Sequence, residues 1–424
     1  MKLDISRLQR TIDQINGIET TQEEGVNRLA LTDGDMKARR LFKEICSSIG
    51  LKIWEDEIGN IWARKEGLDP TLPAVLCGSH LDTVPNGGRY DGLLGVMTAV
   101  EVLQLIQERE LEHDHPIEVV VFSIEESSRF NLSTVGSKAL TGELNPSSLK
   151  NCIDQQGKSL YDVLLKKGYF PDEVEKIKID PSQYKAFVEM HIEQGPVLYR
   201  ESIDIGVVEA IAAPIRFQLN LLGEEAHSGA CPMKMRKDAL TAAAEIILEI
   251  EKKGIEESVH QTVTTTGICR VFPGAMNVVP GEVDLYVDIR GIDIMSMMRA
   301  VTDIVQKVEE ICKKRQVQQI VKIISQEKPV LLNKRMMEAV KENCRRLGLS
   351  HKQMASGAGH DAMNIAKILP TALIFVPCVD GISHNKKERV EARDIENGLS
   401  LLYETILTLA QKDEDLNLEK EADV

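Results

Sequence analysis

Two apolar runs joined by a helix-like run restrict this chain to a fold that contains a parallel β-sheet. Residues 73–77 (PAVLC) and 116–122 (PIEVVVF) have the length and the apolar content of buried strands. Between them lies the run GLLGVMTAVEVLQLIQ, which begins at Gly92. A strand, a helix and a strand in this order form a βαβ unit, in which the two strands are parallel. The sequence therefore predicts an α/β fold.

Polar side chains follow both strands. His80 and Asp82 come after the first strand, Asp91 precedes the predicted helix, and Glu125 and Glu126 follow the second strand. Parallel strands end at the same edge of a sheet, and ligands bind at that edge in open α/β sheets, so these groups are expected to lie together. Two adjacent glutamates do not easily ionise together in a buried site without a cation. The alternative is structural, with Asp91 as a helix cap and the glutamates as solvated loop residues.

Two later segments repeat the pattern of an apolar run followed by a histidine. His191 follows the run AFVEM, and His384 comes shortly after a predicted strand at 371–377. Histidine and carboxylate are natural ligands of Zn²⁺ and also suit Mn²⁺, Co²⁺ and Ni²⁺. A carboxylate such as Asp91 can give one oxygen to each of two ions, and such ions activate water at neutral pH. Each segment taken alone is equally explained as a polar strand end.

The pattern changes between residues 212 and 326. Its predicted elements are an alternating strand at 216–222, a helix at 234–253, strands at 262–271 and 282–290, a helix at 295–313 and a strand at 317–324. This order is the split-βαβ, ferredoxin-like pattern. We therefore predict a catalytic domain formed by residues 1–211 and 327–424, with an inserted α+β domain at 212–326.

Composition argues against several classes of partner. The 424 residues carry a formal net charge of −15, so neither a nucleic acid nor an anionic membrane is an expected partner. The eight cysteines form no CxxC pair, which argues against a zinc ribbon or a redox motif. The first 25 residues contain no apolar signal segment, and no apolar run has transmembrane length, so a cytoplasmic protein is expected. The acidic residues 413–424 are expected to be frayed.

Ten motifs taken together resemble the hydantoinase/carbamoylase family of amidases, a branch of the zinc-peptidase-like amidohydrolases. In chain order they are GSHLDTVPNGGRYDG, IEESSRF, VGSK, AFVEMHIEQGPVL, IGVVEAI, HSGACPM, MNVVPG, DIR, SGAGHDAM and GISHN. The resemblance implies a zinc-peptidase-like catalytic domain with a mixed sheet flanked by helices. It also implies an inserted domain for dimerisation or as a lid, and two divalent ions, with zinc expected before manganese, cobalt or nickel.

The resemblance also implies roles for individual residues. The metal ligands would be His80, Asp91, Glu126, His191 and His384, with Asp91 bridging. Glu125 would be the general base, and Asp82 would orient His80. Substrate contacts would come from Gln194, His227, Asn277, Arg290, Gly357, Gly359 and His360, some of them from the partner subunit of a homodimer formed through the inserted domain. Without the resemblance, these substrate residues would be explained as ordinary loop, turn or ion-pair residues.

In this family, His227 would polarise the scissile carbonyl and Arg290 would hold the substrate carboxylate. We therefore expect an amidohydrolase that cleaves N-carbamoyl-L-amino acids to the amino acid, ammonia and carbon dioxide. The alternative is hydrolysis of allantoate or ureidoglycolate. Residues 212–215 argue against allantoate, because they lack the polar side chain of allantoate-type members. A dipeptidase or N-acyl-amino-acid deacylase would usually carry an aspartate in place of His191. Ala230-Cys231 replaces the two threonines usual after His227, which leaves the substrate open.

Overall fold

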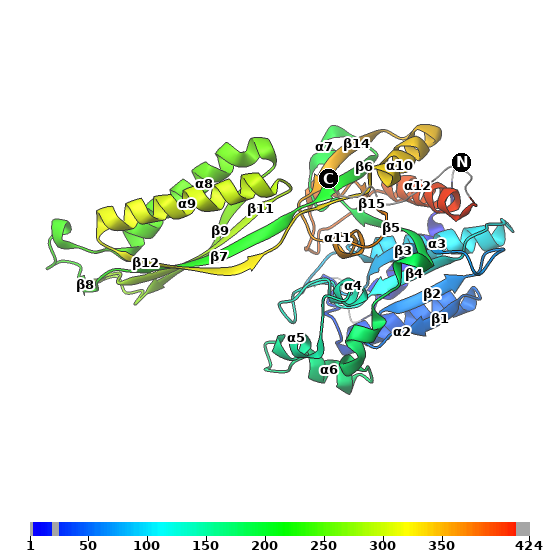
Figure 1. Ribbon diagram of the computed structural model, residues 1–424, viewed down its shortest axis with the longest axis horizontal. Helices are drawn as coiled ribbons and strands as arrows, with labels where there is room; N and C mark the ends of the chain where they lie inside the picture. Colours follow the sequence, from blue (N-terminus) through cyan, green and yellow to red (C-terminus); the bar gives the residue numbers. More distant parts are fainter. Residues whose placement is uncertain (1–2, 19–24, 413–424) are drawn as a thin grey trace. The chain divides into compact units, whose positions relative to one another are not determined.

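The computed structural model of the protein describes residues 3–18 and 25–412, which divide into two units (Figure 1). Unit 1 contains the residues up to Glu209, Leu331–Met354 and the residues from His360, whereas unit 2 contains Ala210–Val330 and Ala355–Gly359. Sequence analysis assigned residues 355–359 to the catalytic domain, whereas these residues group with unit 2 in the structure. The reason is a main-chain contact, since the amide of Ala212 donates to the carbonyl of Ser356 at 2.8 Å. The predicted fraying of residues 413–424 falls outside the described residues.

A mixed sheet forms the centre of unit 1. Its described strands have the order β1-β2-β4-β3-β5-β15-β6-β13, and β14 pairs with β6. Strand β3 is parallel to β4 and β5, and β5 is parallel to β15, whereas β2 and β6 join this group antiparallel. The bounds are β1 Lys52–Glu55, β2 Ile61–Lys65, β3 Ala74–His80, β4 Ile117–Phe122, β5 Tyr184–Ile192, β6 Ile205–Ile211, β13 Val330–Leu331, β14 His351–Ser356 and β15 Thr371–Val376. The predicted mixed α/β fold is thus confirmed.

Helices cover this sheet because the central strands are apolar on both faces. Every residue of β3 and β4 is buried, as in sheets covered on both sides. Helix α3, the predicted helix of the βαβ unit, packs against β3, β4 and β5, and α12 packs against α3 and β15. The helices of unit 1 are α1 Ser6–Asn16, α2 Asp33–Ser48, α3 Leu93–Glu108, α4 Val135–Leu140, α5 Pro146–Asn151, α6 Leu160–Lys166, α7 Val197–Glu201, α10 Lys334–Leu347, α11 Ala362–Ile365 and α12 Ala392–Ala410.

Unit 2 contains a four-stranded antiparallel sheet with the order β12-β7-β11-β9, and helices α8 and α9 lie side by side on one face (Figure 1). Its elements follow the order strand, helix, two strands, helix, strand. Alternate residues of β7 and β11 are buried against the helices, which is the consequence of the period-2 pattern in their sequences. The bounds are β7 Ala213–Leu222, α8 Ala239–Glu257, β9 Val263–Phe272, β11 Glu282–Gly291, α9 Ile294–Arg315 and β12 Gln318–Gln326, with a small pair formed by β8 Ala226–His227 and β10 Val278–Val279.

Over residues 3–18 and 25–412, the structure contains no helix whose length and apolar character would suit a membrane crossing.

Candidate metal centre

Four neighbouring parallel strands of unit 1 deliver polar side chains to one edge of the sheet. His80 is the last residue of β3, and His191 is the penultimate residue of β5. Glu125 and Glu126 follow β4 after a two-residue connection, and His384 follows β15 after a short loop. Because β4, β3, β5 and β15 lie in this order and run parallel, segments far apart in the sequence meet at this edge.

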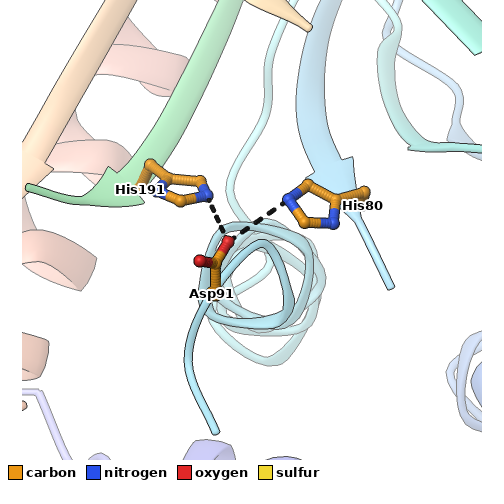
Figure 2. Close-up of side chains that lie close together, drawn as sticks. All are labelled: His80, Asp91 and His191. Atoms are coloured by element: carbon orange, nitrogen blue, oxygen red, sulfur yellow. Dashed lines mark ion pairs between the residues drawn. The ribbon is translucent and has the colours of Figure 1, made fainter. Parts of the chain in front are cut away.

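The first group contains His80, Asp91 and His191, whose possible ligand atoms lie within 4.8 Å of one another (Figure 2). Oδ1 of Asp91 lies 3.5 Å from Nε2 of His80 and 3.2 Å from Nε2 of His191. The Nδ1 atoms donate to main-chain carbonyls, at 2.9 Å to Asp82 and at 2.9 Å to Ile192. These bonds orient both rings, so that in the neutral ring Nε2 is an electron-pair donor on the side of the carboxylate, and in the protonated ring it donates to that carboxylate.

The second group contains Asp91, Glu126 and His384, again with ligand atoms within 4.8 Å of one another. Nε2 of His384 lies 3.2 Å from Oδ2 of Asp91 and 3.4 Å from Oε1 of Glu126. That oxygen of Glu126 is buried and takes part in no hydrogen bond within the described ranges. Each carboxylate oxygen of Asp91 therefore faces a different group, which is the arrangement that a bridging ligand requires.

The charges in this centre are unbalanced without a cation. Burial raises the pKa of Glu125 well above its usual value, and burial followed by the charge of Asp91 raises the pKa of Glu126 to about 7. Burial also disfavours the ionised form of Asp91, but hydrogen bonds with the three histidines outweigh it and hold the pKa of Asp91 well below its usual value. Buried acids of this kind are stabilised by metal coordination. The oxygen of Glu126 that makes no hydrogen bond among the described residues and the shared carboxylate of Asp91 thus fit two divalent ions.

Glu125 lies beside the two groups and belongs to neither. Its Oε2 is 3.8 Å from Nε2 of His80, and its exposed fraction is only 8%. The preceding residue, Ile124, has a positive φ of 56°, a conformation rare for a β-branched residue. This turn brings Glu126 into the second group and leaves Glu125 beside both groups.

Asp82 has a different contact from the one that was predicted. The sequence hypothesis was that its carboxylate orients His80, but Oδ1 of Asp82 lies 3.8 Å from the Nδ1 atom, which bonds to the main-chain carbonyl instead. The carboxylate accepts the main-chain N–H of Glu125 at 3.1 Å and that of Glu126 at 3.0 Å. Asp82 therefore anchors the turn that carries the glutamate pair.

Two of the predicted substrate residues lie against the metal centre in unit 1. Nε2 of Gln194 donates to Oδ2 of Asp91 at 2.8 Å, and its Oε1 is buried and accepts no hydrogen bond in the described part of the chain. His360 is 3% exposed, and its ring centroid lies 4.6 Å from that of His191. Burial lowers the pKa of His360 well below its usual value. This histidine is thus a neutral ring packed behind a ligand candidate.

The predicted substrate residues of unit 2 form two groups. Nε of Arg290 donates to Asp288 at 2.9 Å, and its Nη1 lies 3.4 Å from the carbonyl oxygen of Gly357. His227 pairs with Val278 in the small β8–β10 sheet, and Asn277 is the residue just before that strand. Gly359 lies in the segment Ala355–Gly359.

The strand register of unit 2 places these two groups at opposite ends of its four-stranded sheet. Arg290 lies opposite Pro214 at the start of β7, whereas Glu282 lies opposite Leu222 at the end of β7, next to the β8–β10 pair. The strand between these points is about 27 Å long at roughly 3.4 Å per residue. One small substrate therefore cannot contact Arg290 and His227 of the same unit.

Sequence analysis missed two residues that contact Asp91. Glu388 accepts the main-chain N–H of Asp91 at 3.1 Å, and Oγ of Ser383 lies 3.0 Å from Oδ2 of Asp91. Glu388 stands in the charged stretch NKKER, which has the composition of a solvated loop. The only local signal was its position four residues after His384.

Comparisons with known proteins agree with this geometry. The model of peptidase family M20/M25/M40 matches residues 76–408. The chain belongs to this family. An N-carbamoyl-L-amino-acid amidohydrolase of Pseudomonas sp. is 38% identical over 403 residues, covering 95% of this chain and 97% of that protein. A ureidoglycolate hydrolase of Arabidopsis thaliana is 37% identical over 416 residues, covering 97% of this chain and 87% of that protein.

A solved structure of a hydantoinase/carbamoylase family amidase from Burkholderia multivorans has a TM-score of 0.90 and 34% identity, covering 97% of this chain and 99% of that chain. The predicted family resemblance is thus confirmed, and the chain is a hydrolase of carbon–nitrogen bonds. Members of the M20/M25/M40 family depend in general on two metal ions, and the two groups around Asp91 are able to hold them.

Proposed function

We propose that this enzyme cleaves the carbamoyl carbon–nitrogen bond of N-carbamoyl-L-amino acids, giving the amino acid, ammonia and carbon dioxide. The observation that carries the proposal is the buried carboxylate of Asp91, which offers one oxygen to each of two ligand groups beside a glutamate that belongs to neither group, Glu125. The similarity to the Pseudomonas N-carbamoyl-L-amino-acid amidohydrolase supports this substrate class.

His80, Asp91 and His191 would hold one divalent ion, and Asp91, Glu126 and His384 would hold the other. When bound, the ions would polarise the substrate carbonyl and activate water at neutral pH. Zinc suits this set of imidazoles and carboxylates, as do manganese, cobalt and nickel.

Glu125 is the general base of the proposed reaction. It is buried beside the ligands without being one of them, so its carboxylate takes a proton from the attacking water and returns it to the leaving nitrogen. Asp82 holds the main chain of Glu125 through a hydrogen bond of 3.1 Å, which fixes the base relative to the ligand beside it. Gln194, which contacts Asp91, would bond the ureido group of the substrate in this proposal.

Arg290 binds the substrate carboxylate in this proposal. Asp288 occupies the Nε edge of its guanidinium, at 2.9 Å and 3.3 Å, and this ion pair holds the planar group in a fixed orientation. Among the described residues, the hydrogen bond of Nη1 is one long contact of 3.4 Å, to the carbonyl oxygen of Gly357, so Nη1 has donor capacity for a substrate oxygen. Gly357 and Gly359 would form a main-chain wall beside this carboxylate.

The proposed enzyme is a homodimer that forms through unit 2. His227 and Asn277 lie at the far end of the sheet from Arg290, so they would complete the site of the partner subunit. Strand β12 is an edge of the sheet and exposes a row of apolar side chains, which is typical of an interaction surface. These side chains are Ile320, Val321, Ile323 and Ile324, with exposed fractions between 36% and 57%.

A substrate panel tests this function, with released ammonia as the readout for the ureido substrates and newly released amino acid as the readout for dipeptides and N-acyl-amino acids. The panel contains N-carbamoyl-L-amino acids, allantoate, ureidoglycolate, dipeptides and N-acyl-amino acids. We expect the highest kcat/KM with a carbamoyl-amino acid, loss of turnover with a chelator, and two metal ions per chain by elemental analysis. The similarity to the Arabidopsis ureidoglycolate hydrolase favours ureidoglycolate as the second candidate. A preference for dipeptides, or a protein that binds no metal, would contradict the proposal.

The substitution Glu125→Gln tests the proposed base. Glutamine has the same shape but cannot accept the proton, so kcat should fall by roughly 10²- to 10⁴-fold while the metal content stays at two ions. Glu173→Gln is the control, because Glu173 is an exposed acid that contacts only Lys176 among the ion pairs of the described residues. Turnover that survives the change at position 125 would remove Glu125 from the mechanism.

A further inference from the structure

Glu388, a buried carboxylate that belongs to neither ligand group, accepts hydrogen bonds from the main chain at Asp91. Glu388 is 3% exposed, although it follows two lysines in a charged stretch. Its Oε1 accepts the main-chain N–H of Tyr90 at 2.8 Å and that of Asp91 at 3.1 Å. These bonds join residues 298 and 297 positions apart, so the loop between β3 and α3 is attached to the segment that follows β15.

The other oxygen of Glu388 extends this contact to the side chain of Asp91. Oγ of Ser383 lies 3.0 Å from Oε2 of Glu388 and 3.0 Å from Oδ2 of Asp91. The hydroxyl group has one proton, which it donates to one of the two carboxylates at a time. Asp91 is thus held at its amide nitrogen and at one carboxylate oxygen by the same two residues.

The loop is built closely around this carboxylate. A Cβ atom added at Gly88 would lie 1.9 Å from Cδ of Glu388, far inside contact distance. Position 88 therefore requires glycine for as long as Glu388 occupies this place. Glu388 is nevertheless not a member of either ligand group, so its burial is not explained by metal coordination of its own.

These contacts act on the orientation of the Asp91 carboxylate. Its Oδ1 faces His80 and His191, and its Oδ2 faces His384. A rotation of the carboxylate would remove at least one oxygen from its group. The histidine rings are oriented by their own main-chain acceptors, whereas the Asp91 carboxylate is held by side chains, with Gln194 donating to Oδ2 at 2.8 Å beside the contact from Ser383.

We propose that Glu388, acting together with Ser383, is a positioning residue that holds the Asp91 carboxylate with one oxygen toward each metal group. The inference rests on the proposed dimetal function. The inference also predicts that Glu388 links the segment of Asp91 to the segment of His384, because its partner Ser383 is the residue next to His384. Loss of the contact should therefore weaken the binding of metal rather than the folding of the sheet.

The experiment is a titration of the metal-free full-length protein with Mn²⁺, followed by calorimetry and by electron paramagnetic resonance. The variants are Glu388→Gln, Ser383→Ala and Gly88→Ala, whose new methyl group would displace Glu388. Glu391→Gln is the matched control, because it removes one acid three residues away whose side chain is half exposed. Melting of the metal-free variants, followed by circular dichroism, reports whether each one folds.

We expect the wild-type protein and the control to bind two Mn²⁺ ions and to show the exchange-coupled signal of ions that share a carboxylate. The three variants should bind at least one ion roughly 10- to 100-fold more weakly and lose the coupled signal. The melting temperatures of Glu388→Gln and Ser383→Ala should stay close to the wild-type value, whereas Gly88→Ala should melt lower, because displacing Glu388 leaves two main-chain N–H groups without their acceptor. A merely structural role would lower the melting temperature and leave the affinity of the folded variants unchanged.

The outcomes separate this inference from the function on which it rests. A wild-type protein that binds no Mn²⁺ would overturn both. A wild-type protein that binds two ions, with Ser383→Ala and Glu388→Gln binding them equally well, would overturn the positioning role alone. If Glu388→Gln does not fold, Ser383→Ala decides, since it removes a single hydroxyl group and leaves the bonds from Glu388 to the main chain in place.

Discussion

The substitution Asp82→Asn tests the finding that Asp82 anchors the turn of the glutamate pair. The carboxylate of Asp82 accepts one main-chain N–H with each oxygen, at 3.1 Å from Glu125 and at 3.0 Å from Glu126. Asparagine keeps one acceptor and places an NH₂ group where the second acceptor was. One main-chain N–H then faces the NH₂ group of the asparagine, which is also a donor. This contact is buried, since Asp82 is only 3% exposed.

The size of the effect follows from these contacts. A hydrogen bond to a charged group contributes about 1.5–3 kcal/mol, and a buried N–H without an acceptor costs about 1–3 kcal/mol. The two quantities overlap because they describe the same lost contact. Asp82 is also a counter-charge of the fully buried Arg28, whose pKa burial lowers to about 10. We therefore expect unit 1 to lose about 2–4 kcal/mol of its free energy of unfolding.

Urea unfolding of the metal-free protein measures this loss. The two tryptophans of the chain, Trp54 and Trp62, lie in β1 and β2, so their fluorescence reports unit 1 alone. The midpoint should fall by roughly 1 M if the slope is near 3 kcal/mol per molar urea. Asp180→Asn is the control, because Asp180 caps an exposed turn, and its midpoint should move by less than about 0.2 M.

Metal affinity separates this reasoning from the sequence hypothesis for Asp82. If the carboxylate acted only by orienting His80, the substitution would weaken metal binding and leave the urea midpoint in place. The structure predicts that both change, because the turn that carries Glu126 moves. A midpoint within about 0.2 M of the wild-type value would refute the anchoring role.

Three further predictions concern other parts of the molecule. Gly92 has a positive φ of 64° and an added Cβ would lie 2.5 Å from the His80 ring, so Gly92→Ala should abolish binding of one of two metal ions in calorimetry. Arg290→Ala should raise KM for carbamoyl-amino acids about thirty-fold, or about 2 kcal/mol, with kcat changed only a few-fold in steady-state kinetics. A hydrogen bond from Ser296 is the main cause that holds the pKa of Glu257 at about 2, against a usual 4.5. Its ionised form therefore stabilises unit 2 fully above pH 4.5, and that stabilisation is lost as pH falls through 2. Glu257→Gln should remove this part of the acid dependence in hydrogen exchange of unit 2.

The sequence by itself determined the parallel core of unit 1 and the places at which its strands end. Continuous apolar runs with a helix between them allow few arrangements, because a buried strand must be covered on both faces. His80 and His191 could be located in this way, since each lies at the end of such a run. The alternation at residues 216–222, within β7, likewise indicated a sheet with one buried face.

Only the tertiary structure determined which contacts each of these polar residues makes. That Asp91 offers its oxygens to different groups, that Asp82 bonds to Glu125 and Glu126, and that Glu388 reaches Asp91 depend on contacts between distant segments. The assignment of Ala355–Gly359 to unit 2 has the same origin. Periodicity reports which face of an element is buried, because burial follows local geometry. The partner of a polar side chain depends instead on which loops the packed strands bring together, and no local pattern carries that information.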